Sequence, residues 1–144
     1  MLLLVIMLGL AGVRLTRDRG DIVRDEASRL VVLLQNAHQQ AILEGRLYRF
    51  NVTREGYEFR LTDVEDKLQS IKTSDPLAPH RLPYPVTLNT LRSADQPNVE
   101  IDFDPSGDFT AFTLVLRFDE IVWYVLGSSD GKIRATTELP PTAA

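Results

Sequence analysis

Three aspartates near the middle of the second half, Asp102, Asp104 and Asp108, together with Ser106 and Gly107, imitate the start of a calcium-binding loop. Calcium prefers carboxylate oxygens, and a loop of this type needs a bidentate glutamate at its twelfth position. Counted from Asp102, that position holds Thr113. The run from Asp104 to Gly107 is also typical of a hairpin turn. We therefore expect a turn here, and these aspartates stay only a weak candidate for a metal site.

The remaining residues that could do chemistry are few. The chain has two histidines, His38 and His80, and no cysteine. Two isolated histidines make a poor metal-binding set, and solvated polar positions account for both. The single G-x-S-x-G match, Gly127–Gly131, falls in a turn before the last predicted strand rather than between a strand and a helix, so it does not indicate a nucleophile elbow, and the sequence contains no glycine-rich phosphate loop. We expect no catalytic residue and no cofactor.

Length and composition indicate one ordinary globular domain. The chain has 144 residues, of which 44% are hydrophobic and 25% are charged, and its formal net charge is -4. This size can bury a sizeable core without a covalent staple. The acidic balance argues against a nucleic-acid partner, because phosphate binding depends on a basic excess. The absence of cysteine excludes disulfides but does not indicate a compartment.

The first thirteen residues, MLLLVIMLGLAGV, carry no charge. A helix of this length spans roughly 20 Å, short of the roughly 30 Å hydrocarbon core of a bilayer. A secretory signal segment, a buried core helix and a transmembrane helix lacking its first turn or two all fit the length. The charged, one-sided segment after Val13 favours the third interpretation. It assigns an assembly role to the apolar residues Leu2, Leu3, Leu4, Val5, Ile6, Leu8 and Leu10.

The next segment predicts an amphipathic helix from Asp21 to Glu44, with a bend at Gly20 and a C-cap at Gly45. Its apolar residues recur at steps of four and three, which is the spacing of one helical face. Val31, Leu33 and Ile42 broaden this stripe. We expect it to pack on a folded domain through Val23, Ala27, Leu30, Leu34, Ala37 and Ala41.

Beyond Gly45 the apolar period changes to two, which indicates β-structure. Apolar and polar residues alternate within two segments, Tyr48–Val52 and Tyr57–Leu61. Because a turn separates these segments, they predict a hairpin. Asp63–Arg81 is expected to be a long loop with at most one short helical turn. Pro83 and Pro85 would hold the first of the later strands to a sheet edge. Those later strands are expected at residues 82–91, 99–103, 109–118, 121–126 and 132–135, before a frayed tail.

The order of these elements resembles the GspH class of type II secretion minor pseudopilins. The resemblance covers nearly the whole chain and is strongest in three stretches, Arg24–Arg46, Phe103–Phe118 and Gly127–Arg134. It implies an α+β, pilin-like fold, in which a long N-terminal helix packs on a C-terminal antiparallel β-domain of one or two sheets. The resemblance also implies a division of the chain into three parts. Residues 1–20 would form the transmembrane and assembly half of the helix, residues 21–45 its amphipathic half, and residues 46–144 a periplasmic β-domain.

One departure from the family pattern stands at the start of the sequence. The family begins with a prepilin peptidase site, Gly followed by Phe-Thr-Leu and then a glutamate, and this motif is not present. Met1 stands about where the residue after that glutamate would fall. Two explanations stay open: a start at an internal methionine, or a lost leader. Cleavage, N-methylation and the glutamate contact to a neighbouring subunit are therefore assigned to no residue.

The sequence supports three hypotheses of function. The first is a non-enzymatic minor pseudopilin of the inner membrane, which joins the tip region of a periplasmic pseudopilus and supports protein export across the outer membrane. Its partners would be other minor and major pseudopilins, the membrane and secreted proteins, with no nucleic acid. The second is a minor pilin of a type IV pilus, with assembly, adhesion or DNA uptake as its role. The third is a soluble or secreted enzyme whose first residues are a leader, which would need a pocket with converging titratable groups.

Overall fold

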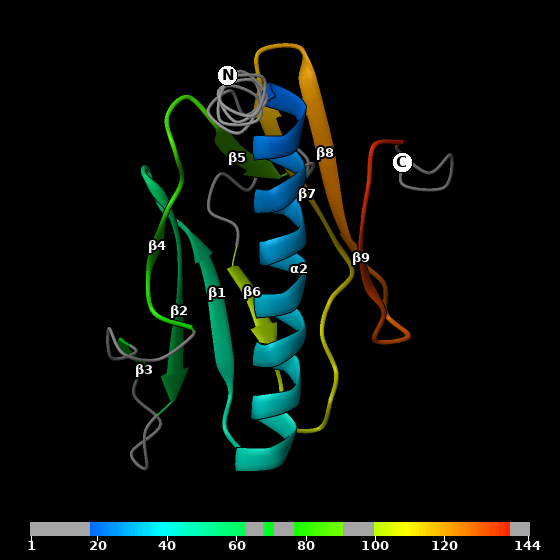
Figure 1. The fold of residues 1–144 in the computed structure, drawn as a ribbon. Helices are drawn as coiled ribbons and strands as arrows, with labels where there is room; N and C mark the ends of the chain where they lie inside the picture. The colour runs from blue at the N-terminus through cyan, green and yellow to red at the C-terminus, as the bar shows by residue number, and fades with distance from the viewer. Residues whose placement is uncertain (1–17, 63–67, 71–76, 91–99, 139–144) are drawn as a thin grey trace, which may run out of the picture.

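The computed structural model describes residues 18–62, 68–70, 77–90 and 100–138. Its one described helix, α2 (Arg19–Glu44), lies against two antiparallel β-sheets (Figure 1). The expected fold class, a helix packed on antiparallel β-structure, is thereby confirmed, and the β-structure divides into two sheets. Residues 1–17, including the predicted assembly residues Leu2 to Leu10, lie outside the described residues.

Helix α2 has well-defined ends. The carbonyl of Asp18 accepts the backbone N–H groups of Asp21 and Ile22 at 3.1 and 3.2 Å, so the helix begins at Arg19, two residues before the predicted start. Gly45 adopts the left-handed conformation (φ 65°, ψ 33°) and its N–H bonds the Ala41 carbonyl. Such a residue ends a helix at little cost only when it lacks a Cβ. The C-cap predicted at Gly45 is confirmed.

No helix within the described residues is both long enough and apolar enough to span a bilayer. The bend predicted at Gly20 concerns the junction with residues 1–17 and stays a prediction.

Sheet one has the strand order β3-β2-β1-β6, and β4 pairs with β2 beside β3. The predicted hairpin is confirmed: β1 and β2 are antiparallel, with Phe50 opposite Phe59. On its other side Phe50 faces Ile101, so one row of large apolar side chains runs across the inner face. The strands are β1 (Tyr48–Val52), β2 (Gly56–Thr62), β3 (Leu68–Ser70), β4 (His80–Arg81) and β6 (Glu100–Phe103).

Sheet two has the order β5-β7-β8-β9, and all its pairs are antiparallel. Its two long central strands, β7 and β8, meet over seven registered pairs from Phe112–Gly127 to Phe118–Ile121. The shorter β5 and β9 form its edges. The strands are β5 (Thr87–Thr90), β7 (Phe112–Phe118), β8 (Ile121–Gly127) and β9 (Ile133–Thr136).

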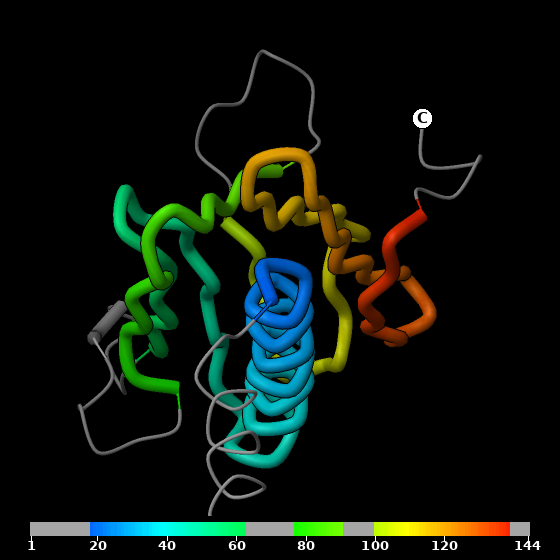
Figure 2. The backbone as a smooth tube through the Cα atoms, turned by 45° about the horizontal axis from the view of Figure 1, so that its top comes forward, coloured from blue at the N-terminus to red at the C-terminus, as the bar shows by residue number. Residues whose placement is uncertain are grey.

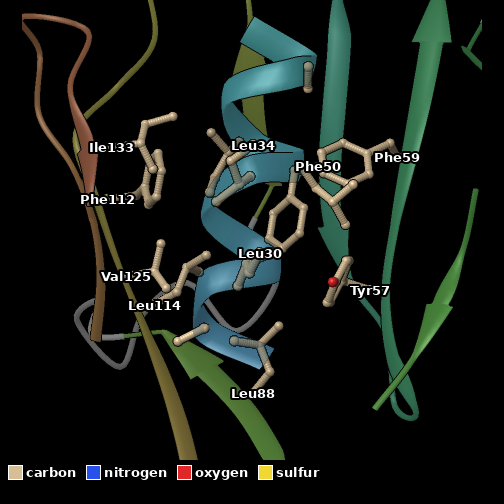
Figure 3. Close-up of a cluster of buried hydrophobic side chains, with 14 of the residues drawn as sticks. Leu30, Leu34, Phe50, Tyr57, Phe59, Leu88, Phe112, Leu114, Val125 and Ile133 are labelled. Carbon is tan, nitrogen blue, oxygen red and sulfur yellow. The ribbon is translucent and has the colours of Figure 1, made fainter. Parts of the chain in front are cut away.

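The core lies where α2 meets both sheets. Figure 2 shows the helix with sheet one on one side and sheet two on the other. In Figure 3, Leu30 and Leu34 lie between Phe50 and Tyr57 of sheet one and the side chains of Phe112, Leu114, Val125 and Ile133 of sheet two. One helix therefore fills the space between two sheets, and neither sheet buries its inner face without it.

The structure corrects several element boundaries. The predicted loop Asp63–Arg81 contains β3 and β4, both paired with β2. The predicted strand at 82–91 shortens to β5, because Pro83 and Pro85 cannot donate ladder hydrogen bonds and a turn closes from the Val86 N–H to the Pro83 carbonyl (2.9 Å). The predicted strand at 109–118 begins only at Phe112, where the ladder with β8 ends.

Candidate assembly surface

Helix α2 has an inner face that is completely buried. The residues of the predicted stripe, each with 0% exposed surface, are Val23, Ala27, Leu30, Leu34, Ala37 and Ala41. Complete burial of a leucine side chain contributes about 1.5–3 kcal/mol to stability. Leu33 is also buried, and Val31 is partly buried against the core. Ile42 was expected to broaden the stripe, but it is 47% exposed, because it lies at the border of the stripe in the last turn of the helix.

The outer face of α2 is uncharged over its second half. The stretch Leu30–Leu43 contains no Asp, Glu, Lys or Arg. Within it, Val32, Ile42 and Leu43 expose 57%, 47% and 79% of their surface. Figure 1 shows no described segment in front of this face. The first half differs, since Arg24 pairs there with Asp21 at 3.1 Å. An uncharged helix face with exposed aliphatic side chains is suited to contact with another protein surface.

A polar cluster fastens β4 to the helix. The Nε2 atom of His80 lies 3.0 Å from Oε2 of Glu26, and both side chains are largely buried, with 17% and 14% exposed. The His80 ring packs on the ring of Tyr57, with centroids 5.2 Å apart. The interpretation of His80 as a solvated polar residue was therefore wrong. The His80–Glu26 pair could not be recognised from the sequence, because the two residues lie in distant parts of the chain and only the fold brings them together.

The hydroxyl of Tyr57 is buried beside this cluster and has no hydrogen-bond partner among the described residues. Burial, and then the carboxylate of Glu26, raise the pKa of Tyr57 well above its ordinary value. The nearby Arg29 guanidinium lowers the pKa of Tyr57, but its position does not meet the geometry of a hydrogen bond to the Tyr57 hydroxyl. A buried hydroxyl without a partner loses its hydration and gains nothing in return.

Replacing Tyr57 by phenylalanine is therefore expected to stabilise the protein by about 1 kcal/mol. The raised pKa also gives a sign for the pH dependence. Above about pH 10 the unfolded chain loses the Tyr57 proton first, so stability falls as the pH rises. Tyr57→Phe should remove this part of the alkaline fall. Urea unfolding at pH 7 and above pH 10 measures both effects, and Tyr84→Phe, at a residue 96% exposed, is the matched control. A destabilised Tyr57→Phe protein would contradict the prediction.

His38 is also not a solvated residue. Its Nε2–H donates to the carbonyl of Gly107 at 2.9 Å, and its ring lies edge-on to Phe109 at a centroid distance of 5.1 Å. A second ring, Phe103, lies 6.0 Å away. His38 therefore ties the second half of α2 to the loop between β6 and β7. The expected solvated position was wrong for the same reason as at His80, because the partner is distant in sequence.

The structure does not bring the three candidate calcium ligands together into one site. Asp102 lies on β6 and forms a two-point ion pair with Arg49, with distances of 2.6 and 3.0 Å, and this hydrogen bonding raises the pKa of Arg49. Asp104 accepts the Ser106 N–H at 2.9 Å, which lowers the pKa of Asp104. Asp108 accepts the Ser106 hydroxyl. No group of three His, Asp or Glu side chains in the described residues could hold a metal ion.

Comparison with known proteins identifies the family of this chain. The model of the family described as "Type II transport protein GspH" matches residues 26–131. That range begins within α2 and ends in the turn before β9, so it includes most of the helix and every strand of both sheets except β9. This chain belongs to the GspH family. The predicted class, a type II secretion minor pseudopilin of the GspH kind, is confirmed at this level.

Two solved structures share the fold of this GspH-family chain. One is the minor pseudopilin EpsH from the type 2 secretion system of Vibrio cholerae, with a TM-score of 0.66 and 19% identity, over 81% of this chain and 98% of that chain. A second crystal structure of EpsH gives 0.68 and 17% identity, over 85% of this chain and 99% of that chain. At such identities the likeness shows the fold alone. No curated protein sequence matches the chain.

Proposed function

We propose that this chain is a non-enzymatic minor pseudopilin that joins the tip region of a type II secretion pseudopilus and supports export of proteins across the outer membrane. The observation that carries the proposal is the division of α2 into two faces. Its inner face is completely buried on both sheets, whereas its outer face exposes Val32, Ile42 and Leu43 on a stretch without charge. Such a helix holds its own domain and still offers a surface to a neighbouring subunit.

The proposed location rests on the sequence before the helix. Residues 1–13 are apolar and uncharged, and α2 begins only a few residues later. In this proposal the apolar segment packs in the inner membrane and among other pseudopilin helices, and the β-domain lies in the periplasm. Leu2 to Leu10 provide this contact. The two EpsH structures, which carry the same fold, are described as a minor pseudopilin of such a secretion system.

The partners in this proposal are other minor and major pseudopilins, with secreted proteins as a further contact. Specificity would come from the rim of the β-domain, whereas the helices supply most of the buried area. No residue acts as a catalyst. Family membership supports type II secretion over the alternative of a minor pilin of a type IV pilus.

Deletion of the gene, with complementation in the bacterium that carries it, tests the proposal. Secretion of exoproteins into the medium should be lost on deletion and restored by the unaltered chain. A double variant, Val32→Arg with Leu43→Arg, should fold but fail to restore secretion, because two charges then stand on the outer face of α2. Ser129→Arg places one such charge on an exposed turn between β8 and β9 and should restore secretion fully.

Two results would contradict the proposal. Unchanged secretion on deletion, together with lost adhesion or DNA uptake, would favour the type IV pilus instead. Full restoration of secretion by the double variant would remove the outer face of α2 as the assembly surface.

A further inference from the structure

Strand β5 is an edge strand with one unpaired side. It pairs with β7 through four residues, from Thr87–Arg117 to Thr90–Leu114, and with no other strand of the described residues. Among the described residues, the backbone N–H and C=O groups on its other side therefore have no strand partner. Figure 1 places β5 near the end of the molecule where α2 begins, away from the exposed lower half of the helix.

β5 also lacks the usual protection of an edge strand. Natural sheets protect edges with charged side chains, prolines or bulges, because an unpaired edge can pair with another chain. β9, the other edge of sheet two, carries the exposed Arg134, and β6, an edge of sheet one, carries Glu100 and Asp102, both paired with Arg49. β5 reads Thr-Leu-Asn-Thr, without charge or proline. It is the uncharged edge among these three strands.

A pocket of about 290 Å³ lies beside this edge. Its lining is mixed. The apolar part comes from Val52 at the end of β1, from Leu82 and Val86 in the turn before β5, and from Leu88 on β5, whereas residues 53–56, Thr87 and Asn89 provide the rest. The opposite rim is fixed, because the Leu82 N–H donates to the Glu55 carbonyl at 3.0 Å and Arg81 pairs with Glu55 at 3.3 Å. The volume is at the lower limit of a small-molecule site and suits one or two side chains better.

The segment between β4 and β5 adds an exposed aromatic ring. Tyr84 lies between Pro83 and Pro85 and has 96% of its surface exposed. Leu82 and Val86, on either side of this tripeptide, line the pocket. Exposed tyrosines are favoured at binding surfaces because they bring large area with little loss of side-chain entropy.

We propose that β5 and its pocket accept an extended segment of a partner polypeptide as an additional strand of sheet two. The unpaired backbone groups of β5 require a main chain in β conformation as their complement. The apolar part of the pocket, formed by Val52, Leu82, Val86 and Leu88, suits an aliphatic side chain on that segment. This surface is separate from α2, so the inference goes beyond the proposed function and does not depend on it.

The interaction is expected to be weak, since β5 offers only four residues for pairing. A dissociation constant on the order of 10⁻⁴ M is reasonable for such a short strand. Weak strand pairing of this kind suits a partner that is held and released rather than one that is permanently built in.

A capped six-residue peptide of alternating threonine and leucine is the probe, added to the full chain in detergent micelles. Hydrogen exchange should slow at residues 87–90 and stay unchanged in β9. The same peptide N-methylated at its two central residues keeps its side chains but loses one N–H from each edge. It should bind at least about tenfold more weakly, because strand pairing needs those groups.

Variants then locate the site. Asn89 is exposed on β5, and Asn89→Lys adds the protection that the edge lacks, so binding should weaken by about tenfold. Thr136→Lys places the same charge on β9 as the matched control and should bind as the unaltered chain does. Equal binding of the N-methylated peptide, protection at β9 instead of β5, or no binding up to about 1 mM would each overturn the proposal. Self-pairing of two copies through β5 would also overturn it, because the occupant would then be this chain.

Discussion

Replacing Leu34 by alanine is expected to lower the free energy of unfolding by about 3 kcal/mol and the melting temperature by roughly 10 °C. Leu34 has no exposed surface and lies where both sheets meet α2, between Phe50 on one side and Phe112 and Ile133 on the other (Figure 3). Neither sheet can move inward to fill the cavity without losing its contact with the rest of the helix. The cost should therefore stay near the middle of the range for leucine truncation.

The same helix provides the control. Leu43→Ala makes the identical chemical change nine residues later, at a side chain that is 79% exposed, and should change stability by less than about 0.5 kcal/mol. Urea unfolding measures both, with fluorescence of Trp123 as the signal, because it is the one tryptophan of the chain and packs against the core. Equal costs at the two positions would show that the interior does not hold α2 as described.

The local parts of the fold could be predicted from the sequence. The stripe from Val23 to Ala41 repeats at helical spacing, and Gly45 stands where a C-cap is needed, so periodicity and backbone chemistry agree. The hairpin of β1 and β2 was predictable for a similar reason, because alternation and a short turn specify both strands. In these segments each residue depends mainly on its sequence neighbours.

Contacts between distant segments could not be predicted. β4 has two residues and β3 has three, which is too short for any period to appear, and both exist only because β2 lies beside them. The His80–Glu26 pair joins residues 54 positions apart. The division into two sheets depends on strand order, which hydrophobic alternation does not specify.

The same limit applies to the candidate surfaces. The uncharged stretch Leu30–Leu43 is visible in the sequence, but only helical phase separates its outer residues from the inner ones, and the prediction for Ile42 was wrong in this respect. The pocket beside β5 joins Val52 to Leu88, and these come from different sheets. A surface built from two sheets needs the fold before it can be recognised.

Replacing Gly56 by alanine is expected to destabilise the protein by about 2–3 kcal/mol. A Cβ at Gly56 would collide with the backbone of the facing strand, within 3.0 Å of the carbonyl carbon of His80 and 3.1 Å of the Cα of Arg81, and closer still to the His80 carbonyl oxygen. Gly56 pairs with Arg81 in the β2–β4 ladder, so no rotamer change can relieve the contact. β4 must move away from β2.

That movement has a consequence beyond stability, because β4 carries His80 to Glu26 and continues into the turn that lines the pocket. Amide exchange should therefore accelerate at residues 80–90 as well as at Tyr57, while β7 and β8 keep their protection.

Gly20→Ala is the control. The atom nearest to a Cβ at Gly20 lies 4.0 Å away, and alanine in the first helical turn should stabilise the protein by up to about 1 kcal/mol. If Gly56→Ala were as harmless as Gly20→Ala, β4 would not lie against β2 at this distance. The rim of the pocket would then have no fixed position from which β5 could receive a partner strand.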